Sequence, residues 1–487
     1  MVQTLRDKTI NGGLWMGIER FATSTFLFVS NIVLARLLCP EDFGILGLLL
    51  VFVHLADSII DGGFGAALIQ RKNATDKDFS TIFYWNLFVS ILLYVIVFFT
   101  APKFSEWFSE PSFARLLRVT GIVLIINALC VIQRTKLTKD LNFKKLANIN
   151  LFSALVATII CIICAYFGFG VWSLVVKVLL TSIFASVFLW RKSNWYPQKI
   201  FSIESLKSLF NFGAFMFLTS VVNSLYINII SFVLGKKFST RELGFFTQAR
   251  KLQDVPREAV TAIVTNVTFA AFSTIQDDRE RLLLAIKKSL ATLCFMSFPL
   301  TFFLMIAAKP LILLFFKEKW LPSVEYMQII CLYGLLMSII DFNQGVLKAV
   351  GKTKLLFVTG ITRKTLGIVM IILGALWGVK GLLSMYVLSQ VVGFVIVAFP
   401  LGKIINYGLF PQIKQMLPSF LLSLVSAAAV YWGASKINIE SNFILVLIQF
   451  TAFCSLYIAL NYLFKYKYFF YLKSIAFSKI GEMFGKK

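Results

Sequence analysis

The sequence predicts an all-α, polytopic membrane protein with two pseudo-symmetric six-helix lobes and two additional C-terminal helices. Three observations carry this prediction. The 487 residues are 58% hydrophobic and only 15% charged, whereas soluble domains carry about 25% charged residues. A membrane-spanning helix needs about 20 mainly apolar residues, and about 14 such segments follow one another with short connections. The second half of the chain also repeats features of the first.

The apolar segments define the expected spans, and charged residues cluster in the short loops between them. The first six are 10–35, 42–70, 79–101, 113–133, 147–167 and 170–190. The next six are 207–234, 243–272, 287–308, 322–345, 353–376 and 379–401. The last two are 413–435 and 442–464. The expected domains are an N-terminal lobe 1–200, a C-terminal lobe 201–402, a helix pair 403–464 and a basic tail 465–487.

The distribution of positive charge predicts the orientation in the membrane. Most of the 48 lysines and arginines lie in the tails and loops, or at the span ends beside them, on the same side of the membrane as both termini. The opposite side carries few, among them Lys236, Lys237 and Arg241. Cytoplasmic loops of membrane proteins are enriched in lysine and arginine, so both termini are expected in the cytoplasm. The net charge of +25 is therefore interpreted as a topology signal, and nucleic acid is not an expected partner.

An internal repeat links the two expected lobes. Seven residues recur 200 positions later: Asn11, Gly13, Met16, Ser24, Val33, Leu34 and Gly44 match Asn211, Gly213, Met216, Ser224, Val233, Leu234 and Gly244. Farther along, Gly170 and Ser173 match Gly381 and Ser384. Repeats in the same orientation predict a twofold axis along the membrane normal and a cavity between the lobes.

A first polar stripe lies within the expected span 42–70. His54, Asp57 and Asp61 are spaced i, i+3, i+7, so they share one helical face. An ionisable group at a helix centre in the bilayer costs roughly 2.5–3.5 kcal/mol on insertion scales. The stripe can therefore face a cavity and bind a proton, a cation or a substrate hydroxyl. Alternatively, it forms hydrogen bonds between helices, with Gly62 and Gly63 permitting close packing.

A second polar stripe occupies the matching span 243–272. Arg250, Asp254, Arg257 and Glu258 share a face by their i, i+4, i+7, i+8 spacing, and Pro256 interrupts the helix. A freed backbone carbonyl is tolerated where a helix borders water. The stripe is interpreted as a cavity wall, with an internal ladder of salt bridges as the alternative.

Further cations lie inside other expected spans, and a surplus of cations favours an anionic ligand. Arginine suits pyrophosphate because its planar fork donates two parallel hydrogen bonds. The expected residues of the substrate-binding cavity are Arg20, Lys177, Arg250, Arg257, Arg363 and Lys364. The expected residues for ion or proton coupling are His54, Asp57, Asp61, Asp254 and Glu258.

Seven motifs carry a family resemblance: LLCPEDFGILGL (37–48), DGGFGAALIQRK (61–72), FYWN (83–86), RTKLTKDLNFKKLA (134–147), GFGVWSLV (168–175), GFFTQARKL (244–252) and VTNVTFAAFS (264–273). They resemble the Wzx-type lipid-linked oligosaccharide flippases, most closely the colanic-acid exporters, within the multidrug/oligosaccharidyl-lipid/polysaccharide (MOP) superfamily. The resemblance implies a V-shaped fold. It also implies alternating-access translocation of undecaprenyl-pyrophosphate-linked oligosaccharide repeat units across the bacterial inner membrane, for exopolysaccharide, capsule or O-antigen synthesis.

The same resemblance frames the expected partners and the rival functions. Membrane lipids, a polysaccharide polymerase and a chain-length regulator are expected partners, and transport needs no cofactor beyond coupling to H⁺ or Na⁺. A drug or cation antiporter of the same superfamily would favour an acidic cavity, and a lipid II flippase is a narrower alternative. An enzyme such as a ligase or polymerase would need a sizeable loop carrying catalytic polar residues, so no catalytic or metal site is expected.

Overall fold

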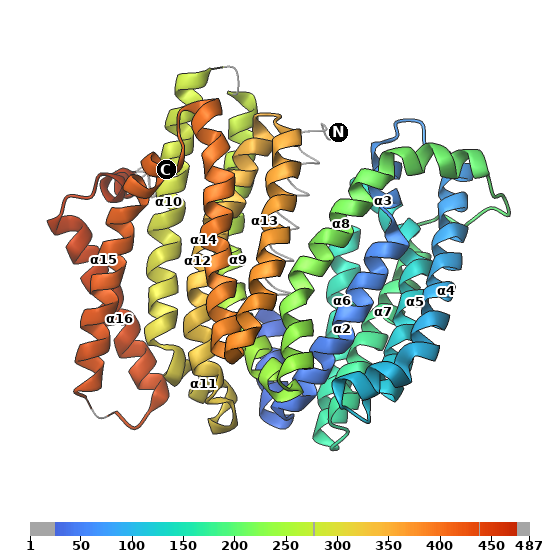
Figure 1. Cartoon of the computed structure of the whole chain (residues 1–487), viewed down its shortest axis with the longest axis horizontal. Coiled ribbons are helices and arrows are strands. Elements are labelled where there is room, and N and C mark those ends of the chain that lie inside the picture. Colours follow the sequence, from blue (N-terminus) through green and yellow to red (C-terminus); the bar gives the residue numbers. More distant parts are fainter. Residues whose placement is uncertain (1–24, 276–277, 438, 475–487) are drawn as a thin grey trace, which may run out of the picture. The chain divides into compact units, whose positions relative to one another are not determined.

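The computed structural model describes residues 25–275, 278–437 and 439–474, which are built from long α-helices joined by short connections (Figure 1). Within those residues the regular secondary structure is helical throughout. Many large apolar side chains point outward from the helices, including Phe88, Phe99 and Phe152. Exposed apolar surface on this scale suits a lipid environment and not water. The predicted all-α, multi-pass membrane architecture is therefore confirmed.

Packing divides the chain into two compact units, of which the first is 1–244. Its helices are α2 (Pro40–Asp61), α3 (Phe64–Gln70), α4 (Asp76–Phe108), α5 (Phe113–Lys139), α6 (Phe143–Tyr166), α7 (Val171–Lys192) and α8 (Ile203–Lys237). Helix α4 packs along α5, α7 packs on both α5 and α6, and α8 packs on α2. One buried cluster joins Leu68 of α3, Phe83 of α4 and Ile132 of α5.

The second compact unit is 245–487. It holds most of α9 (Thr240–Thr274), then α10 (Arg279–Ile306), α11 (Ala308–Phe316), η1 (Glu318–Trp320), α12 (Ser323–Ala349), α13 (Thr353–Gly374), η2 (Ala375–Trp377), α14 (Gly378–Ile405), α15 (Leu409–Ser435) and α16 (Asn442–Leu463). Helix α14 packs against α12 and α13, while α10 packs against α12 and α15. The core contains Phe298 of α10, Phe342 of α12 and Val397 of α14. The polar side chains of α9 described below lie against this bundle.

The expected spans correspond closely to these helices. Eleven described segments are long and apolar enough to cross a membrane, and one of them, 353–405, contains two expected spans, so the eleven cover twelve of the expected fourteen. The expected span 243–272 lies in α9, which is long but too polar to belong to that group. The expected span 10–35 lies mainly outside the described residues, which begin within the helix Thr25–Leu37.

The expected span 42–70 is wrong as a single helix. Gly62 and Gly63 have φ values of 53° and 76°, in the left-handed region that glycine adopts without steric penalty. They end α2 at Asp61 and let α3 begin at Phe64. The hydropathy pattern continues through the break because both helices are apolar.

The compact units are defined by packing contacts, whereas the expected lobes are defined by the sequence repeat, so their boundaries need not coincide. Helix α8, which the repeat assigns to the second expected lobe, packs on α2 and α4 in the first compact unit. The lobe boundaries 1–200, 201–402 and 403–464 follow the sequence repeat and stay a prediction.

Two glycines related by the repeat mark a close helix crossing within 1–244. A Cβ on Gly44 would lie 1.7 Å from the backbone oxygen of Thr240, and a Cβ on Gly244 would lie 1.9 Å from that of Pro40. Both pairs are related by the same offset of 200 residues. A reciprocal contact of this kind is what a twofold axis produces. The starts of α2 and α9 thus cross about a local pseudo-twofold axis.

Candidate functional site

The polar stripe of α9 forms a compact set of ion pairs. Arg250 Nε donates to Asp254 Oδ2 at 3.2 Å, and Arg257 Nε donates to Asp254 Oδ1 at 3.3 Å. Helical spacings of four and three residues place all three side chains on one face. Their side chains are 25%, 23% and 14% exposed in the order Arg250, Asp254, Arg257. One half-buried carboxylate therefore holds two guanidinium groups.

Arg257 also connects α9 to α12. Its Nη1 lies 3.6 Å from Asp341 Oδ2, and its Nη2 lies 3.7 Å from Oε1 of the exposed Glu258. Asp341 was not singled out from the sequence. The criterion that identified the other candidates, an ionisable side chain inside an expected span, also applies to Asp341, which lies within 322–345. The residue was missed because no other charged residue lies near it inside the expected span 322–345.

A glycine on α12 allows the approach of these two helices. A Cβ at Gly334 would lie 1.7 Å from Nε2 of Gln253 and 3.1 Å from Cδ of Arg257. Gln253 is itself buried on α9. A larger residue at position 334 would therefore first displace the side chain of Gln253 and then crowd the stem of Arg257.

Arg363 lies on α13 and is buried in protein, with an exposed fraction of 3%. Its Nη1 donates to Gln390 Oε1 of α14 at 3.2 Å. The arginine stem crosses α14 at Gly393, where a Cβ would lie 2.6 Å from Arg363 Cδ. The carboxylate of Asp341 is attracted electrostatically by both Arg257 and Arg363. Arg363 is therefore an electrostatic neighbour of Asp341, positioned by α13 and α14.

The first polar stripe separates into three different environments. Asp57 accepts hydrogen bonds from Asn127 Nδ2 on α5, at 3.3 Å to Oδ1 and 3.2 Å to Oδ2. Arg134, on the same helix as Asn127, is close enough to attract this carboxylate. The side chain of His54 is exposed, and its backbone oxygen accepts from Ser224 Oγ at 3.2 Å. Asp57 is thus the member of the stripe whose side chain bonds to a neighbouring helix, whereas His54 is bonded to one only through its backbone oxygen.

Asp61 has a structural position at the break between α2 and α3. The backbone N–H groups of Gly63 and Gly65 lie close enough to attract its carboxylate. A Cβ at Gly65 would lie 2.9 Å from Asp61 Oδ1. A carboxylate at a helix N-terminus satisfies N–H groups that have no partner within the helix. Asp61 therefore lies beside the first N–H groups of α3, a position that fits the packing alternative for this part of the stripe.

The remaining candidates are more dispersed. Lys177 is half-buried on α7, and Lys364 is half-buried beside Arg363 on α13. Arg20 lies outside the described residues. Within the described second unit, the network around Arg257 contains equal numbers of opposite charges, namely Arg250, Arg257 and Arg363 against Asp254, Glu258 and Asp341. An anionic ligand would therefore have to compete with internal carboxylates for the same guanidinium groups.

Comparisons with known proteins cover both polar stripes. A family model described as polysaccharide biosynthesis protein matches residues 33–325. The lipopolysaccharide biosynthesis protein WzxC of Escherichia coli (strain K12) is 27% identical over 436 residues, 88% of either chain. The succinoglycan biosynthesis transport protein ExoT of Rhizobium meliloti (strain 1021) is 24% identical over 435 residues, 87% of either chain.

The fold also has a close counterpart among solved structures. The lipid II flippase MurJ, in its inward closed conformation, superposes with a TM-score of 0.77 over 92% of this chain and 99% of that one. The two sequences are 16% identical, so the likeness shows a shared fold.

Proposed function

The chain belongs to the polysaccharide biosynthesis protein family, and we propose that it is a flippase for undecaprenyl-pyrophosphate-linked oligosaccharide repeat units. The family match and the similarity to WzxC confirm the resemblance to Wzx-type exporters. A relative named as a transport protein of succinoglycan biosynthesis supports transport as the activity. The proposed location is the bacterial inner membrane, with both termini in the cytoplasm.

The observation that carries the substrate class is the paired guanidinium arrangement on α9. Arg250 and Arg257 each meet Asp254 through Nε. A guanidinium group has five N–H donors in a fixed fork, so an arginine can meet phosphate oxygens through its terminal nitrogens while Nε keeps Asp254. At Arg257 the phosphate would replace Asp341 or Glu258 at those terminal nitrogens. The two arginines lie about two helical turns apart on one face of α9, and both forks reach Asp254 between them. Two forks that converge on one point suit a ligand with two linked phosphates. Arg363, Lys177, Lys364 and Arg20 are proposed to add positive charge along the path.

The physical task explains why the charges are balanced. The lipid tail can stay in the bilayer while the sugar–pyrophosphate head crosses it. When no substrate is bound, Asp254 and Asp341 neutralise the arginines and lower the cost of burying them. When substrate enters, its phosphates replace part of these pairs. Binding and release then exchange one set of ion pairs for another as access alternates.

Coupling to an ion gradient is proposed to act through the carboxylates. A proton or Na⁺ at Asp254 or Asp341 would cancel a charge that holds Arg257 and so strengthen phosphate binding in one access state. Such a difference in affinity between states is what alternating access requires. Asp57, with His54 beside it, is the proposed counterpart in the first unit. Asp61 is assigned to the structure of α3, and Glu258 to the exposed edge of the network.

Alanine substitutions test the proposed substrate site in cells that depend on this protein for polysaccharide export. Arg250→Ala and Arg257→Ala should abolish export while the protein still accumulates in the membrane. Lysine at either position should restore it only in part, because a point charge lacks the bidentate fork. Arg281→Ala is the matched control, since Arg281 is 81% exposed and pairs with Asp278, and it should export normally.

The outcomes separate the rival functions. Normal export by both interior alanine variants would refute the arginine site. Rescue of a strain that lacks lipid II flipping, without any export of polysaccharide, would replace the proposal by the lipid II alternative. Gradient-driven efflux of organic cations by the parent protein would favour the antiporter alternative.

A further inference from the structure

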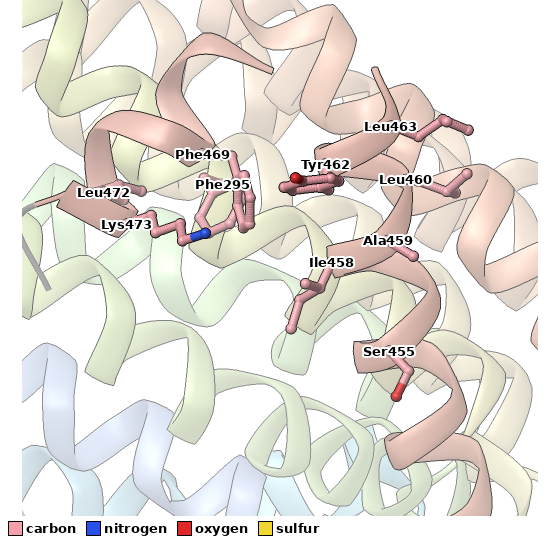
Figure 2. A pocket seen from close by; sticks show the side chains of 10 residues that line it. All are labelled: Phe295, Ser455, Ile458, Ala459, Leu460, Tyr462, Leu463, Phe469, Leu472 and Lys473. Carbon is pink, nitrogen blue, oxygen red and sulfur yellow. The ribbon is translucent and has the colours of Figure 1, made fainter. Parts of the chain in front are cut away.

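An apolar groove lies at the C-terminal end of α16 (Figure 2). Its volume is about 880 Å³, within the range of small-molecule sites. Its walls come from three elements: the last turns of α16 with Ile458 and Ala459, helix α10 with Phe295, and the helical segment 467–474 with Phe469. In Figure 2 the aromatic rings gather at one end, and Ile458 continues the groove along α16.

The chain reversal after α16 creates this groove. Lys465 takes a positive φ of 49°, and the backbone N–H of Tyr466 donates to the oxygen of Asn461 at 3.0 Å. The following segment then runs back beside α10. Phe469 packs on Phe295 with ring centroids 6.1 Å apart. This contact leaves the outward face of α16 exposed beside it, with Tyr462 at 61% exposure.

Positive charge lies at the same end as the aromatic rings. Lys473 Nζ lies 5.9 Å from the centroid of the Tyr462 ring and lines the groove. Lys288 Nζ of α10 lies 4.7 Å from the centroid of the Tyr471 ring. Among the described residues that line the groove, none is acidic. The groove therefore combines an apolar floor with a cationic mouth.

We propose that this groove binds an anionic phospholipid of the bilayer, with an acyl chain along α16 and the phosphate at Lys473. Hydrocarbon and not water fills an apolar groove at membrane depth, so an acyl chain is the natural occupant. The expected topology places the end of α16 at the cytoplasmic face, where anionic headgroups attract lysines near the surface. Lys473 selects a headgroup with net negative charge over a zwitterionic one. The proposal is independent of the transported substrate.

The test is a lipid titration of the purified full-length protein, followed by native mass spectrometry. Phosphatidylglycerol should bind more tightly than phosphatidylcholine with the same acyl chains. Lys473→Ala should weaken phosphatidylglycerol binding about fivefold, the size expected for one lysine near a membrane surface, and leave phosphatidylcholine unchanged. Ala459→Trp, at an exposed position on α16, should occupy the groove and weaken binding of both lipids.

Lys436→Ala is the matched control. Lys436 also lies over an aromatic ring, 5.8 Å from the centroid of Trp432, but it follows the C-terminus of α15 and does not line the groove. The variant should bind phosphatidylglycerol like the parent. Equal affinity of the parent for the two lipids, or equal behaviour of Lys473→Ala and Lys436→Ala, would overturn the proposal. Unchanged lipid binding by Ala459→Trp would also overturn it. So would preferential displacement of phosphatidylglycerol by undecaprenyl phosphate, because the groove would then take an isoprenoid tail.

Discussion

Alanine at Gly44 or Gly244 should destabilise the protein, because these residues let two backbones meet at the crossing of α2 and α9. The Cβ of Gly44→Ala would lie 1.7 Å from the backbone oxygen of Thr240. Real Cβ atoms essentially never approach another atom closer than 3.0 Å. The helices must therefore separate by at least 3.0 − 1.7 = 1.3 Å, or 3.0 − 1.9 = 1.1 Å for Gly244→Ala.

The size of the effect follows from two opposing terms. Overpacking typically costs about 1–3 kcal/mol, and here the obstacle is a backbone carbonyl that has no side-chain rotamer to change. Alanine inside a helix gains roughly 1 kcal/mol over glycine from intrinsic propensity. The cost of the clash should exceed the gain in helix propensity, so the net effect should be a loss of stability. Separation of the helices would also loosen the ion pair between Glu41 and Arg241, whose atoms are 3.3 Å apart.

The assay is thermal unfolding of the purified variants in detergent, with Gly360→Ala as the matched control. Gly360 is a helical glycine of α13, and nothing lies within 4 Å of the position its Cβ would occupy. Gly360→Ala should unfold at or above the parent temperature, and both crossing variants should unfold clearly below it. If Gly44→Ala and Gly360→Ala unfold at the same temperature, the inferred backbone contact is refuted.

Two further predictions concern coupling and topology. Asp57→Asn removes the charge that Asn127 contacts, so transport should continue but lose its dependence on an imposed proton or sodium gradient. Asp61→Asn, at the break between α2 and α3, should keep that dependence. Gradient-driven transport by Asp57→Asn like that of the parent would exclude Asp57 as a coupling group. In a background without native cysteines, Ser109→Cys and Lys237→Cys should react with an impermeant thiol reagent from the periplasm. Lys199→Cys should not, and its labelling from outside would contradict the expected number of spans.

Hydropathy predicted the helices because the bilayer imposes a simple requirement on each span. About 20 apolar residues suffice to mark one, and twelve expected spans reappear in the described helices. Hydropathy did not predict the break at Gly62 and Gly63, because it carries no information on backbone dihedral angles. The expected span 243–272 is only weakly apolar, and the helix that contains it, α9, falls outside the group of strongly apolar helices.

Helical periodicity predicted which candidate residues share a face but not which helix they contact. Spacings of three and four residues are local, so the grouping of Arg250, Asp254 and Arg257 could be predicted from the sequence. Their partner Asp341 comes from α12, and its approach depends on a glycine at position 334. Partners of this kind follow from tertiary packing. The position of Asp61 beside the N-terminus of α3 could not be predicted either, because α3 begins only where the break at Gly62 and Gly63 ends α2.

The most direct measurement follows lipid-linked oligosaccharide across a membrane that contains only this protein. Purified protein is reconstituted into liposomes with undecaprenyl-pyrophosphate-linked oligosaccharide, and the headgroup on each leaflet is counted with an impermeant sugar-modifying enzyme. Protein-dependent equilibration of the headgroup between leaflets, lost in Arg257→Ala and kept in Arg281→Ala, is the predicted result. If the parent protein leaves the oligosaccharide on its original leaflet while empty and protein-containing liposomes behave alike, the proposed flippase function is contradicted.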